Sequence, residues 1–430
     1  MRPGEPILLV CHGFPPVRGI GGRRWVKFAK ELARRGHPVH VIRNAATPAT
    51  LTSLWAGDAR HPLIIHHPLP QRYPSVMTKR PLRGTFEKLA YHAWLRLLPL
   101  FIRGNFHDTA AFWRRQLVAE GDRLIRAHGI RQVIVTGAPF HLMAFATAWK
   151  TRLPHIRLVT DFRDEWTWGG HYGFTSLSQR RQQEEKDLEA LVIRNSDVVI
   201  TPHQAIVEHL GARYGNELKR VVRIPHAVDP DDLPAPSPPP ADGKFRMIYA
   251  GSLYRSDEAD RYFRSLLDAF EATRAKHPDR FARVQLDLYI TSQGVADLRK
   301  RVEERGLSGH IHFHAPLPPK EILRRIGQAD LVPLFLSSDK KDAVVTKLHE
   351  LFLLRRPVLH IGEPGAVGRM IAGHGLGASL RLDELAVELP KILGGERVIA
   401  VDLAADHGAF LLGPVTDRLV REALQADRPA

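Results

Sequence analysis

The sequence predicts an α/β protein of two domains, each built around a doubly wound parallel sheet. Three observations lead to this fold class. A chain of 430 residues is longer than one hydrophobic core usually organises. Short apolar runs alternate with longer segments of helical periodicity in both halves. A proline-rich stretch interrupts this alternation, and we place an exposed linker there, at residues 226–243.

The start of the chain shows the pattern most clearly. Residues 7–10 predict a buried strand, and a loop rich in glycine and proline follows at residues 13–22. Apolar residues at helical spacing fill residues 25–35, and residues 39–42 predict the next strand. A strand, a crossover helix and a second strand form the unit from which doubly wound parallel sheets are built.

Similar units recur along the chain. Further strands are expected at residues 132–136, 157–160 and 197–200, then at 245–250, 285–290, 311–314, 331–334 and 358–361. We therefore expect a first domain at residues 1–225 and a second at residues 244–405.

The positive charge of the chain is concentrated in its first part. The net charge is +16, and residues 1–150 contain 23 Lys and Arg against 7 Asp and Glu. Residues 226–430 contain 28 basic against 29 acidic residues. A basic face attracts anionic lipid surfaces, lipid-linked diphosphates or nucleic acid, although an arginine-rich composition alone is the alternative. We expect no nucleic-acid partner, since no helix-turn-helix, zinc or RNA-binding signature accompanies the charge.

The compartment is predicted from what the sequence lacks. The single cysteine, Cys11, excludes an intrachain disulfide and is expected to be a buried side chain in a reducing compartment. We find neither a secretory signal nor a run of about 20 apolar residues. The expected location is therefore cytoplasmic, peripheral on the inner face of the cell membrane.

Residues 79–115 interrupt the strand and helix pattern. They combine basic residues with large apolar ones, and Phe86, Leu89 and Leu97 share one face of a helix. Lys79 and Arg103 are among the basic residues on its flanks. Such a helix either docks on a membrane or packs on the sheet, and the sequence leaves both interpretations open.

Several kinds of catalytic centre have no signature here. The 23 histidines do not combine with cysteine or carboxylates at ligand spacing, so no metal site is expected. There is no Gly-x-Ser-x-Gly elbow, no phosphate-binding Gly-x-x-x-x-Gly-Lys-Ser/Thr loop and no Gly-x-Gly-x-x-Gly fingerprint. A serine hydrolase, a nucleotide hydrolase and a dehydrogenase all lose their main support.

Three segments could carry chemistry. The loop at residues 15–24 brings backbone amides to a helix start, where an anion is favoured, or is merely a tight turn. The segment 160–166 (TDFRDEW) places carboxylates, Arg163 and Trp166 at the end of a strand, where α/β sheets bind ligands. Its alternative is a structural ion pair of Asp161 with Arg163. In the third segment, a helix that begins near Thr346 directs Lys347 and Glu350 to the same end, where they would suit a diphosphate and a ribose. The alternative is that Glu350 and its neighbours form an ordinary solvated turn.

Together these segments resemble family-4 retaining glycosyltransferases of the GT-B fold. The likeness covers nearly the whole chain. It rests on the opening P-P-x-x-G-G…L-A-x-x-G-H-x-V-x-V-I, on D-F-R-D-x-W, and on T-K-L-H-E-L-F-L-L-R-R-P-V-L. The resemblance implies two Rossmann-like domains facing a central cleft, the acceptor bound by residues 1–225 and the nucleotide-sugar donor by residues 244–405. It also implies that a C-terminal helix within residues 406–430 crosses back to the first domain.

The same resemblance assigns residues to roles. Glu350 takes the place of the glutamate that binds ribose, whereas Asp342 stands where the family has a second glutamate beside the donor sugar. Ser252 replaces the arginine that usually contacts the diphosphate, so Arg255 or Lys347 is expected to neutralise the leaving group. The expected donor site comprises Glu350, Lys347, Thr346, Arg255, Gly251, Ser252 and Gly365. The expected acceptor site comprises Gly21, Gly22, Arg163 and Trp166, and the candidate catalytic residues are Asp164, His141 and Asp342.

The predicted reaction is transfer of a hexose-type sugar from a nucleoside diphosphate to an acceptor hydroxyl with retention, without cofactor or required metal. The basic first half suggests a lipid-linked glycan acceptor in cell-surface polysaccharide assembly, at an anionic membrane surface. A soluble acceptor is the alternative within enzymes. A non-catalytic nucleotide-sugar-binding scaffold is the alternative outside them, and the departures at Asp342 and Ser252 are its support.

Overall fold

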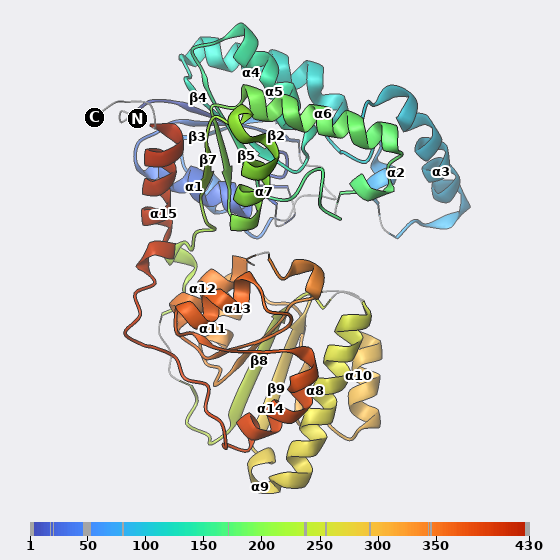
Figure 1. Cartoon of the computed structure of the whole chain (residues 1–430), viewed down its shortest axis with the longest axis vertical. Coiled ribbons are helices and arrows are strands. Elements are labelled where there is room, and N and C mark those ends of the chain that lie inside the picture. The colour runs from blue at the N-terminus through green and yellow to red at the C-terminus, as the bar shows by residue number, and fades with distance from the viewer. Residues whose placement is uncertain are drawn as a thin grey trace. The chain divides into compact units, whose positions relative to one another are not determined.

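The structure of the protein is a computed structural model that describes residues 4–17, 19, 21–45, 53–79, 81–170, 172–235, 239–253, 256–291, 294–342, 344 and 346–425. The chain forms two compact units: in Figure 1 the first runs from blue to green and also contains the red helix near the C-terminus, and the second runs from green to red. Unit 1 consists of residues 1–226 and 412–430, and unit 2 of residues 227–411. The last part of the chain thus returns to unit 1, six residues after the expected start of the crossing segment at residue 406.

Unit 1 is built on one parallel sheet of seven strands, in the order β3-β2-β1-β4-β5-β6-β7. The strands are β1 (Ile7–Val10), β2 (Val39–Asn44), β3 (Ile64–Leu69), β4 (Gln132–Gly137), β5 (Arg157–Phe162), β6 (Val198–Thr201) and β7 (Val221–Arg223). The helices are α1 (Arg23–Arg34), α2 (Ser75–Thr78), α3 (Gly84–Phe101), α4 (Arg114–His128), α5 (His141–Arg152), α6 (Gln179–Asn195), α7 (Gln204–Tyr214) and α15 (Leu412–Leu419).

Helices cover both faces of this sheet. On one face the apolar side chains of α4, α5 and α6 pack on alternate strand residues such as Leu158 and Phe162. Asp161 of β5 points to the opposite face, because successive strand residues alternate. There it accepts a hydrogen bond from Trp25 of α1 (2.6 Å). α15 packs beside α1, and Arg35 at the end of α1 pairs with Asp417 (2.6 Å).

Unit 2 repeats this architecture. Its strands are β8 (Phe245–Gly251), β9 (Val284–Ile290), β10 (Ile311–Phe313), β11 (Val332–Phe335), β12 (Val358–Ile361) and β13 (Gly377–Leu380). They form two parallel sheets, β10-β9-β8 and β11-β12-β13, joined where Met247 pairs with Leu331. The helices are α8 (Asp257–Lys276), α9 (Pro278–Phe281), α10 (Val295–Glu304), α11 (Pro319–Ile326), α12 (Thr346–Leu354), α13 (Ala366–Gly373) and α14 (Leu385–Leu393).

Both units therefore have the Rossmann strand order, in which the third, second, first, fourth, fifth and sixth strands are neighbours. This confirms the predicted class of two doubly wound parallel-sheet domains. The order in which successive strands are added reverses between β1 and β4 in unit 1 and between β8 and β11 in unit 2, although all the strands are parallel. Ligands of such sheets bind where the carboxyl ends of these central strands diverge.

The expected linker is not fully exposed. Residues 227–243 belong to unit 2, and its first residues are held in place. Val228 is buried and pairs with Leu411, and the buried Asp229 accepts a hydrogen bond from the backbone N of Asp231 (3.0 Å). Proline disfavours regular elements, but the apolar and acidic residues between the prolines still find buried partners.

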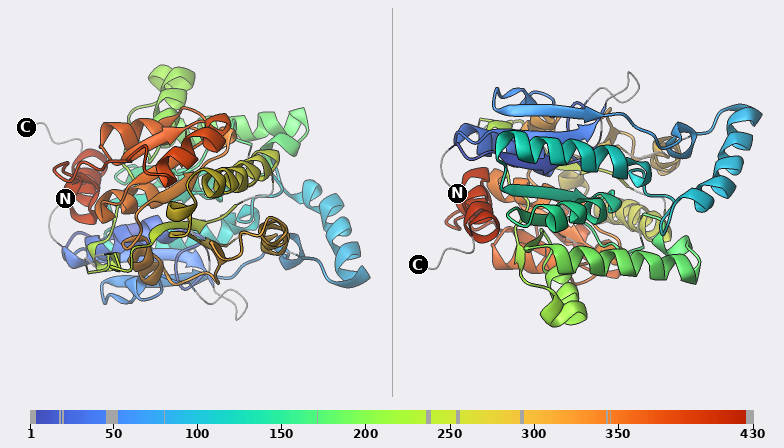
Figure 2. Two further views of the ribbon diagram at one scale, coloured as in Figure 1. Left: turned by 90° about the horizontal axis from the view of Figure 1, so that it is seen from below. Right: turned by 90° about the horizontal axis from the view of Figure 1, so that it is seen from above.

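α3 differs from the other long helices of unit 1. In Figure 2 it lies apart from the helices that cover the sheet. One side of it packs with α2 in a small apolar cluster of its own, made by Tyr73, Met77, Leu98 and Ile102. The second interpretation of residues 79–115, a helix packed on the sheet, is therefore wrong. Among the described residues, no helix is long and apolar enough to cross a membrane.

Candidate functional sites at the two switch points

The site in unit 2 lies where β8 ends and α12 begins. Gly251 is the last residue of β8, and its backbone has a φ of +152°. The ammonium of Lys347, in the first turn of α12, lies directly over it: a Cβ at Gly251 would be 2.6 Å from Lys347 Nζ. Only a residue without a side chain allows this approach. The spacing of three residues places Glu350 on the same side of α12 as Lys347.

Burial and charge set the protonation of this pair. Burial lowers the pKa of Lys347 to about 8, and the neighbouring Glu350 opposes that shift. Lys347 Nζ also lies 5.9 Å from the centre of the Tyr249 ring, a weak cation–π contact. Glu350 is itself buried, and Leu348 and Leu351 anchor the other side of α12 in the core. The helix thus presents a cation at an N-terminus whose free amides also favour anions.

The other predicted donor residues are placed as follows. Gly365 lies so close to the loop after β11 that a Cβ would be 2.1 Å from the carbonyl oxygen of Lys341. Ser252 exchanges a hydrogen bond with Thr291 (2.8 Å between hydroxyl oxygens), and Asp342 has an exposed side chain. Arg255 lies outside the described residues, as does the side chain of Thr346.

The site in unit 1 is a pocket of about 400 Å³ at the other switch point. Its walls come from the loops after β1 and β4, from the start of the loop after β5, and from the segment that follows α3. They include Cys11, His12, Gly13, Val17, Gly21, Asn105, His107, Asp108, Thr109, Ala138, Pro139, Phe140, Arg163 and Tyr172. Burial raises the pKa of Cys11 to about 12 and lowers that of His12 to about 4, so both line the pocket uncharged at neutral pH.

Arg163 organises one wall of this pocket. Its guanidinium donates to the carbonyl oxygen of Gly21 and pairs with Asp164 (3.1 Å between Nε and Oδ2). Tyr172 donates to the same carboxylate oxygen (2.8 Å). Burial opposes the charge of Arg163, but Asp164 and other neighbours outweigh it and raise its pKa. Three predicted residues, Gly21, Arg163 and Asp164, are therefore neighbours here.

Gly22 lies in the same loop as Gly21, between β1 and α1. A Cβ at this position would be 2.2 Å from the carbonyl oxygen of Gly13, so glycine lets the loop fold back at the start of α1. Asp161 does not pair with Arg163 as the structural interpretation expected. It accepts hydrogen bonds from Trp25 (2.6 Å) and Thr136 (3.0 Å), and Arg24 lies 3.5 Å away.

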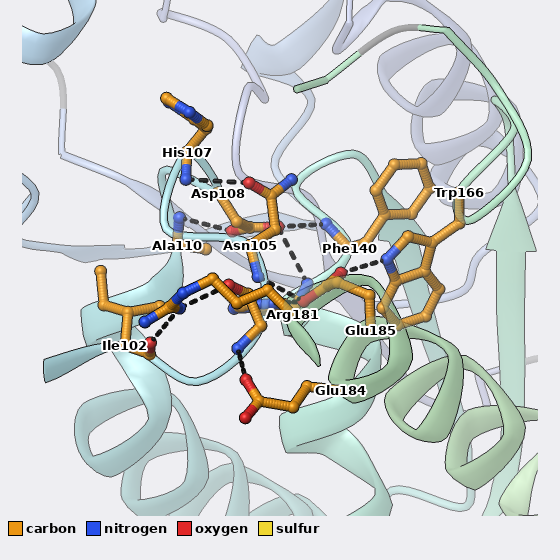
Figure 3. A network of polar contacts seen from close by, with 12 residues as sticks. Ile102, Asn105, His107, Asp108, Ala110, Phe140, Trp166, Arg181, Glu184 and Glu185 are labelled. Carbon is orange, nitrogen blue, oxygen red and sulfur yellow. Dashed lines mark hydrogen bonds and ion pairs between the residues drawn. The ribbon is translucent and has the colours of Figure 1, made fainter. Parts of the chain in front are cut away.

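Two of the predicted site residues have buried side chains that make their contacts inside unit 1. His141 and Trp166 are both buried, and both bind the carboxylate of Glu185 (2.7 and 2.6 Å). Figure 3 shows the contact of Trp166 with Glu185. The Trp166 ring stacks on Phe140, with centroids 5.1 Å apart. Their physical role is therefore to hold the pocket wall from inside unit 1. A residue's place at a strand end or a helix start predicts that it lies near the site. It does not predict whether its side chain points into the pocket or into the interior.

Glu185 and Asp108 were missed. Glu185 also accepts a hydrogen bond from the backbone N of Asn105 (2.7 Å), and Asp108 accepts one from the backbone N of Phe140 (2.8 Å; Figure 3). Asp108 also accepts from the backbone N of His141 (3.1 Å). A signal for Glu185 exists in the sequence, because it lies at helical spacing from the buried Val192 and Ile193. Asp108 lies in an irregular segment that gives no such signal.

A larger hollow of about 760 Å³ lies elsewhere in unit 2. Phe245, Arg283 and Leu331 contribute to it, so it borders the amino ends of β8, β9 and β11. Ligands of doubly wound sheets bind at the carboxyl ends, where Gly251 and Lys347 lie, and we therefore do not assign this hollow to the site.

Solved structures define the fold class. Sucrose-phosphate synthase from Thermosynechococcus elongatus is 15% identical over 97% of this chain and 95% of that chain, with a TM-score of 0.52. A lipopolysaccharide outer core galactosyltransferase is 13% identical over 96% and 95%, with a TM-score of 0.52. UDP-GlcNAc 2-epimerase from Neisseria meningitidis, bound to UDP-GlcNAc, is 10% identical over 98% and 100%, with a TM-score of 0.53. The chain has the GT-B fold.

The family follows from a sequence comparison. Residues 21–232 match the family model described as Glycosyltransferase Family 4, a segment that lies almost entirely in unit 1. Over this segment the chain matches that family of glycosyltransferases, which confirms the resemblance seen in the motifs. No curated protein sequence matches the chain.

Proposed function

We propose that the protein transfers a hexose-type sugar from a nucleoside diphosphate to an acceptor hydroxyl, with retention of the anomeric configuration. The observation that carries the proposal is the approach of Lys347 to Gly251 at the switch point of unit 2, with Glu350 one turn along α12. A partly buried cation, a bare backbone and a helix start suit a diphosphate, and a buried carboxylate suits two ribose hydroxyls.

The chemistry follows from where charge develops. As the bond from the sugar to the diphosphate breaks, negative charge grows on the leaving phosphate, and groups already directed at it lower the barrier. Lys347 and the amides at the start of α12 supply this stabilisation in our proposal, which requires no metal. Burial lowers the pKa of Lys347 to about 8, so its ammonium form predominates at neutral pH, and a bound diphosphate would favour it further.

The acceptor is proposed to bind in the pocket of unit 1. Asp164 is held by Arg163 and Tyr172, and its side chain is 36% exposed, so it can accept a hydrogen bond from an incoming hydroxyl. The basic residues of the first half favour a lipid-linked saccharide at the inner face of the cell membrane, in cell-surface polysaccharide assembly. The likeness to a lipopolysaccharide galactosyltransferase supports this acceptor class.

Two other functions have support of their own. The likeness to sucrose-phosphate synthase favours a soluble acceptor. Ser252, which bonds to Thr291, and the exposed Asp342 replace residues that the family resemblance places beside the donor, and these departures favour a nucleotide-sugar-binding scaffold without turnover.

The first experiment is a thermal-shift panel of UDP, GDP, dTDP, ADP and CMP on the wild type, Glu350→Ala and the control Glu303→Ala. Glu303 is exposed on α10, so its replacement should not change nucleotide binding. A ligand that binds only the folded state raises its melting temperature. We expect one nucleotide to stabilise the wild type and the control but not Glu350→Ala. If no nucleotide stabilises the wild type, the donor site is refuted; stabilisation without sugar transfer would favour the scaffold.

A further inference from the structure

α3 carries an unusual set of exposed apolar side chains. Phe86 is 83% exposed, Leu100 74% and Phe101 70%, and Leu89 and Leu97 are exposed beside them. At about 100° per residue, these five positions lie within an arc of roughly 120° on one side of the helix. We call them the apolar stripe of α3. Scattered exposed leucines are normal in proteins, but a contiguous apolar surface marks a site of interaction.

The stripe is presented by a helix that is firmly attached. Leu98, on another side of α3, is fully buried in the apolar cluster with Tyr73 and Met77. Arg181 of α6 holds the end of the helix by donating to the carbonyl oxygens of Pro99, Ile102 (2.9 Å) and Gly104 (2.8 Å). Part of this clamp is visible in Figure 3. The exposed stripe is therefore a fixed surface rather than the frayed side of a loose helix.

Charge beside the stripe indicates what covers it. Arg96 is exposed at the edge of the stripe, Lys88 is exposed farther round α3, and Arg83 and Arg103 are exposed at its two ends. Glu87, the acidic residue of the helix, pairs with Lys79, and Arg103 pairs with the exposed Asp187 of α6 (3.9 Å), so cations still outnumber carboxylates along this basic border. Apolar residues bordered by Lys and Arg are the composition of a helix that lies in the interface of an anionic bilayer.

The pocket of unit 1 begins where the helix ends. Asn105, His107 and Asp108, which follow α3 within seven residues of Phe101, form part of its wall. The backbone of this segment is tied to α6, since Glu184 accepts from Gly104 N (2.8 Å) and Glu185 from Asn105 N (2.7 Å). A surface that holds α3 would therefore also be close to the pocket wall.

We propose that the apolar stripe of α3 inserts into the interface of an anionic phospholipid bilayer, so that the pocket of unit 1 takes an acceptor carried in that bilayer. The second half of this inference rests on the proposed transferase function, whereas the first half does not. The occupant of the stripe is the bilayer itself, and the basic border selects its anionic headgroups.

The experiment is flotation of the full chain with vesicles of phosphatidylglycerol and phosphatidylethanolamine, compared with phosphatidylcholine vesicles. We expect the wild type to float with the anionic vesicles, and the triple variant Phe86→Ser, Leu100→Ser, Phe101→Ser to partition at least about tenfold less. Lys88→Glu with Arg96→Glu should reduce flotation on anionic vesicles, and added salt should weaken the wild type in the same way. The matched control replaces three exposed apolar residues of unit 2, Val387, Val398 and Leu403, by serine and should float like the wild type.

Three results would overturn the inference. The first is a wild type that stays with the pellet, and the second is a stripe variant that floats as well as the wild type. The third is a wild-type dimer in solution that the stripe variant converts to monomer, because a second copy would then cover the stripe. Nucleotide stabilisation of the same variants is measured without vesicles. If it persists when flotation fails, only the docking inference is lost; if it is absent from the wild type, the proposed donor site fails whatever the vesicles show.

Discussion

The two units share a strand order but differ at their switch points. In unit 1 the cations near the switch point are used internally: Arg24 donates to the carbonyl oxygens of Ile224 and Pro225 (both 2.8 Å), and Arg163 to Gly21 and Asp164. In unit 2, Lys347 lies over the bare backbone of Gly251. The same topology thus produces two different sites. In unit 1 the arginines are hydrogen-bonded within the protein, whereas in unit 2 the ammonium of Lys347 lies against the backbone of Gly251.

This contrast is the reverse of what the overall charge suggests. Residues 1–150 hold the excess of positive charge, whereas residues 226–430 are close to neutral. Yet the cation suited to a diphosphate lies in unit 2. The excess charge of the first half includes exposed residues such as Lys88 and Arg96 on α3. Net charge therefore indicates which charged surfaces a protein is attracted to, whereas the charge in a binding site is set by a few single residues.

The largest expected effect comes from the cation of unit 2. Lys347→Met should lower kcat/KM for the donor by about 10²- to 10³-fold, because a group that stabilises the leaving phosphate is lost. For the wild type, kcat/KM should fall as the pH rises above about 8, where Lys347 loses its proton, and this alkaline limb should be absent from the variant. Release of nucleoside diphosphate measures both. Lys391→Met, far along the chain on α14, is the control, and equal losses in the two variants would contradict the assignment.

The buried pair of unit 1 should affect stability instead. Glu185→Gln leaves the charge of His141 without its partner and should cost about 3 kcal/mol of unfolding free energy, measured by denaturant titration. Glu217→Gln breaks an exposed pair with Arg194 (3.1 Å) and should cost under about 1 kcal/mol. Similar losses of unfolding free energy in both variants would show that the buried pair of Glu185 and His141 stabilises the fold no more than an exposed pair does.

The pH dependence of this pair has a defined sign. Burial opposes the charge of His141, but Asp108 and Glu185 outweigh it and raise its pKa to about 9. A raised histidine pKa stabilises the fold fully below the unfolded value of about 6.5, and this contribution is lost as the pH rises through about 9. The wild type should therefore lose stability between these values, and Glu185→Gln should lose less.

Local patterns predicted the elements well because strand and helix periodicity are properties of short segments. The pairing of Lys347 with Glu350 was predictable for the same reason, since three residues on one helix set their relation. The contact of Lys347 with Gly251 joins residues far apart in the chain, and it was indicated only through the family resemblance. Contacts of this kind follow from sheet order, which no local spacing encodes.

The sequence did not predict the direction in which two of the site side chains point. Trp166 and His141 sit beside strand ends, as expected, but face the interior of unit 1 because Glu185 provides a buried partner. Glu185 lies in a helix rich in charged residues, where Glu184 next to it is only partly buried. A prediction that weighs carboxylates by their phase relative to Val192 would have separated the two.

A smaller effect is expected from the wall of the acceptor pocket. Arg163→Ala removes charge-assisted hydrogen bonds to Gly21 and Asp164, each worth about 1.5–3 kcal/mol, and should raise KM for the acceptor by about 20-fold. KM for the donor and the nucleotide thermal shift should stay unchanged, because Arg163 belongs to unit 1. Steady-state kinetics with each substrate varied in turn measures this. A change in donor binding alone would contradict the division of roles between the units.

The smallest effect tests the glycine that distinguishes unit 2. Gly251→Ala adds a Cβ that would be 2.6 Å from Lys347 Nζ, at a backbone φ of +152° that favours glycine. The flexible ammonium can move aside, so the fold should survive, but a cation displaced by about 1 Å should lower kcat/KM for the donor by roughly tenfold. Gly373→Ala is the matched control, because no atom lies within 4 Å of its added Cβ. If Gly251→Ala retains full activity while Lys347→Met does not, the reaction requires the ammonium of Lys347 but not its close approach to Gly251. The difference between the two switch points would then be only the charge of Lys347.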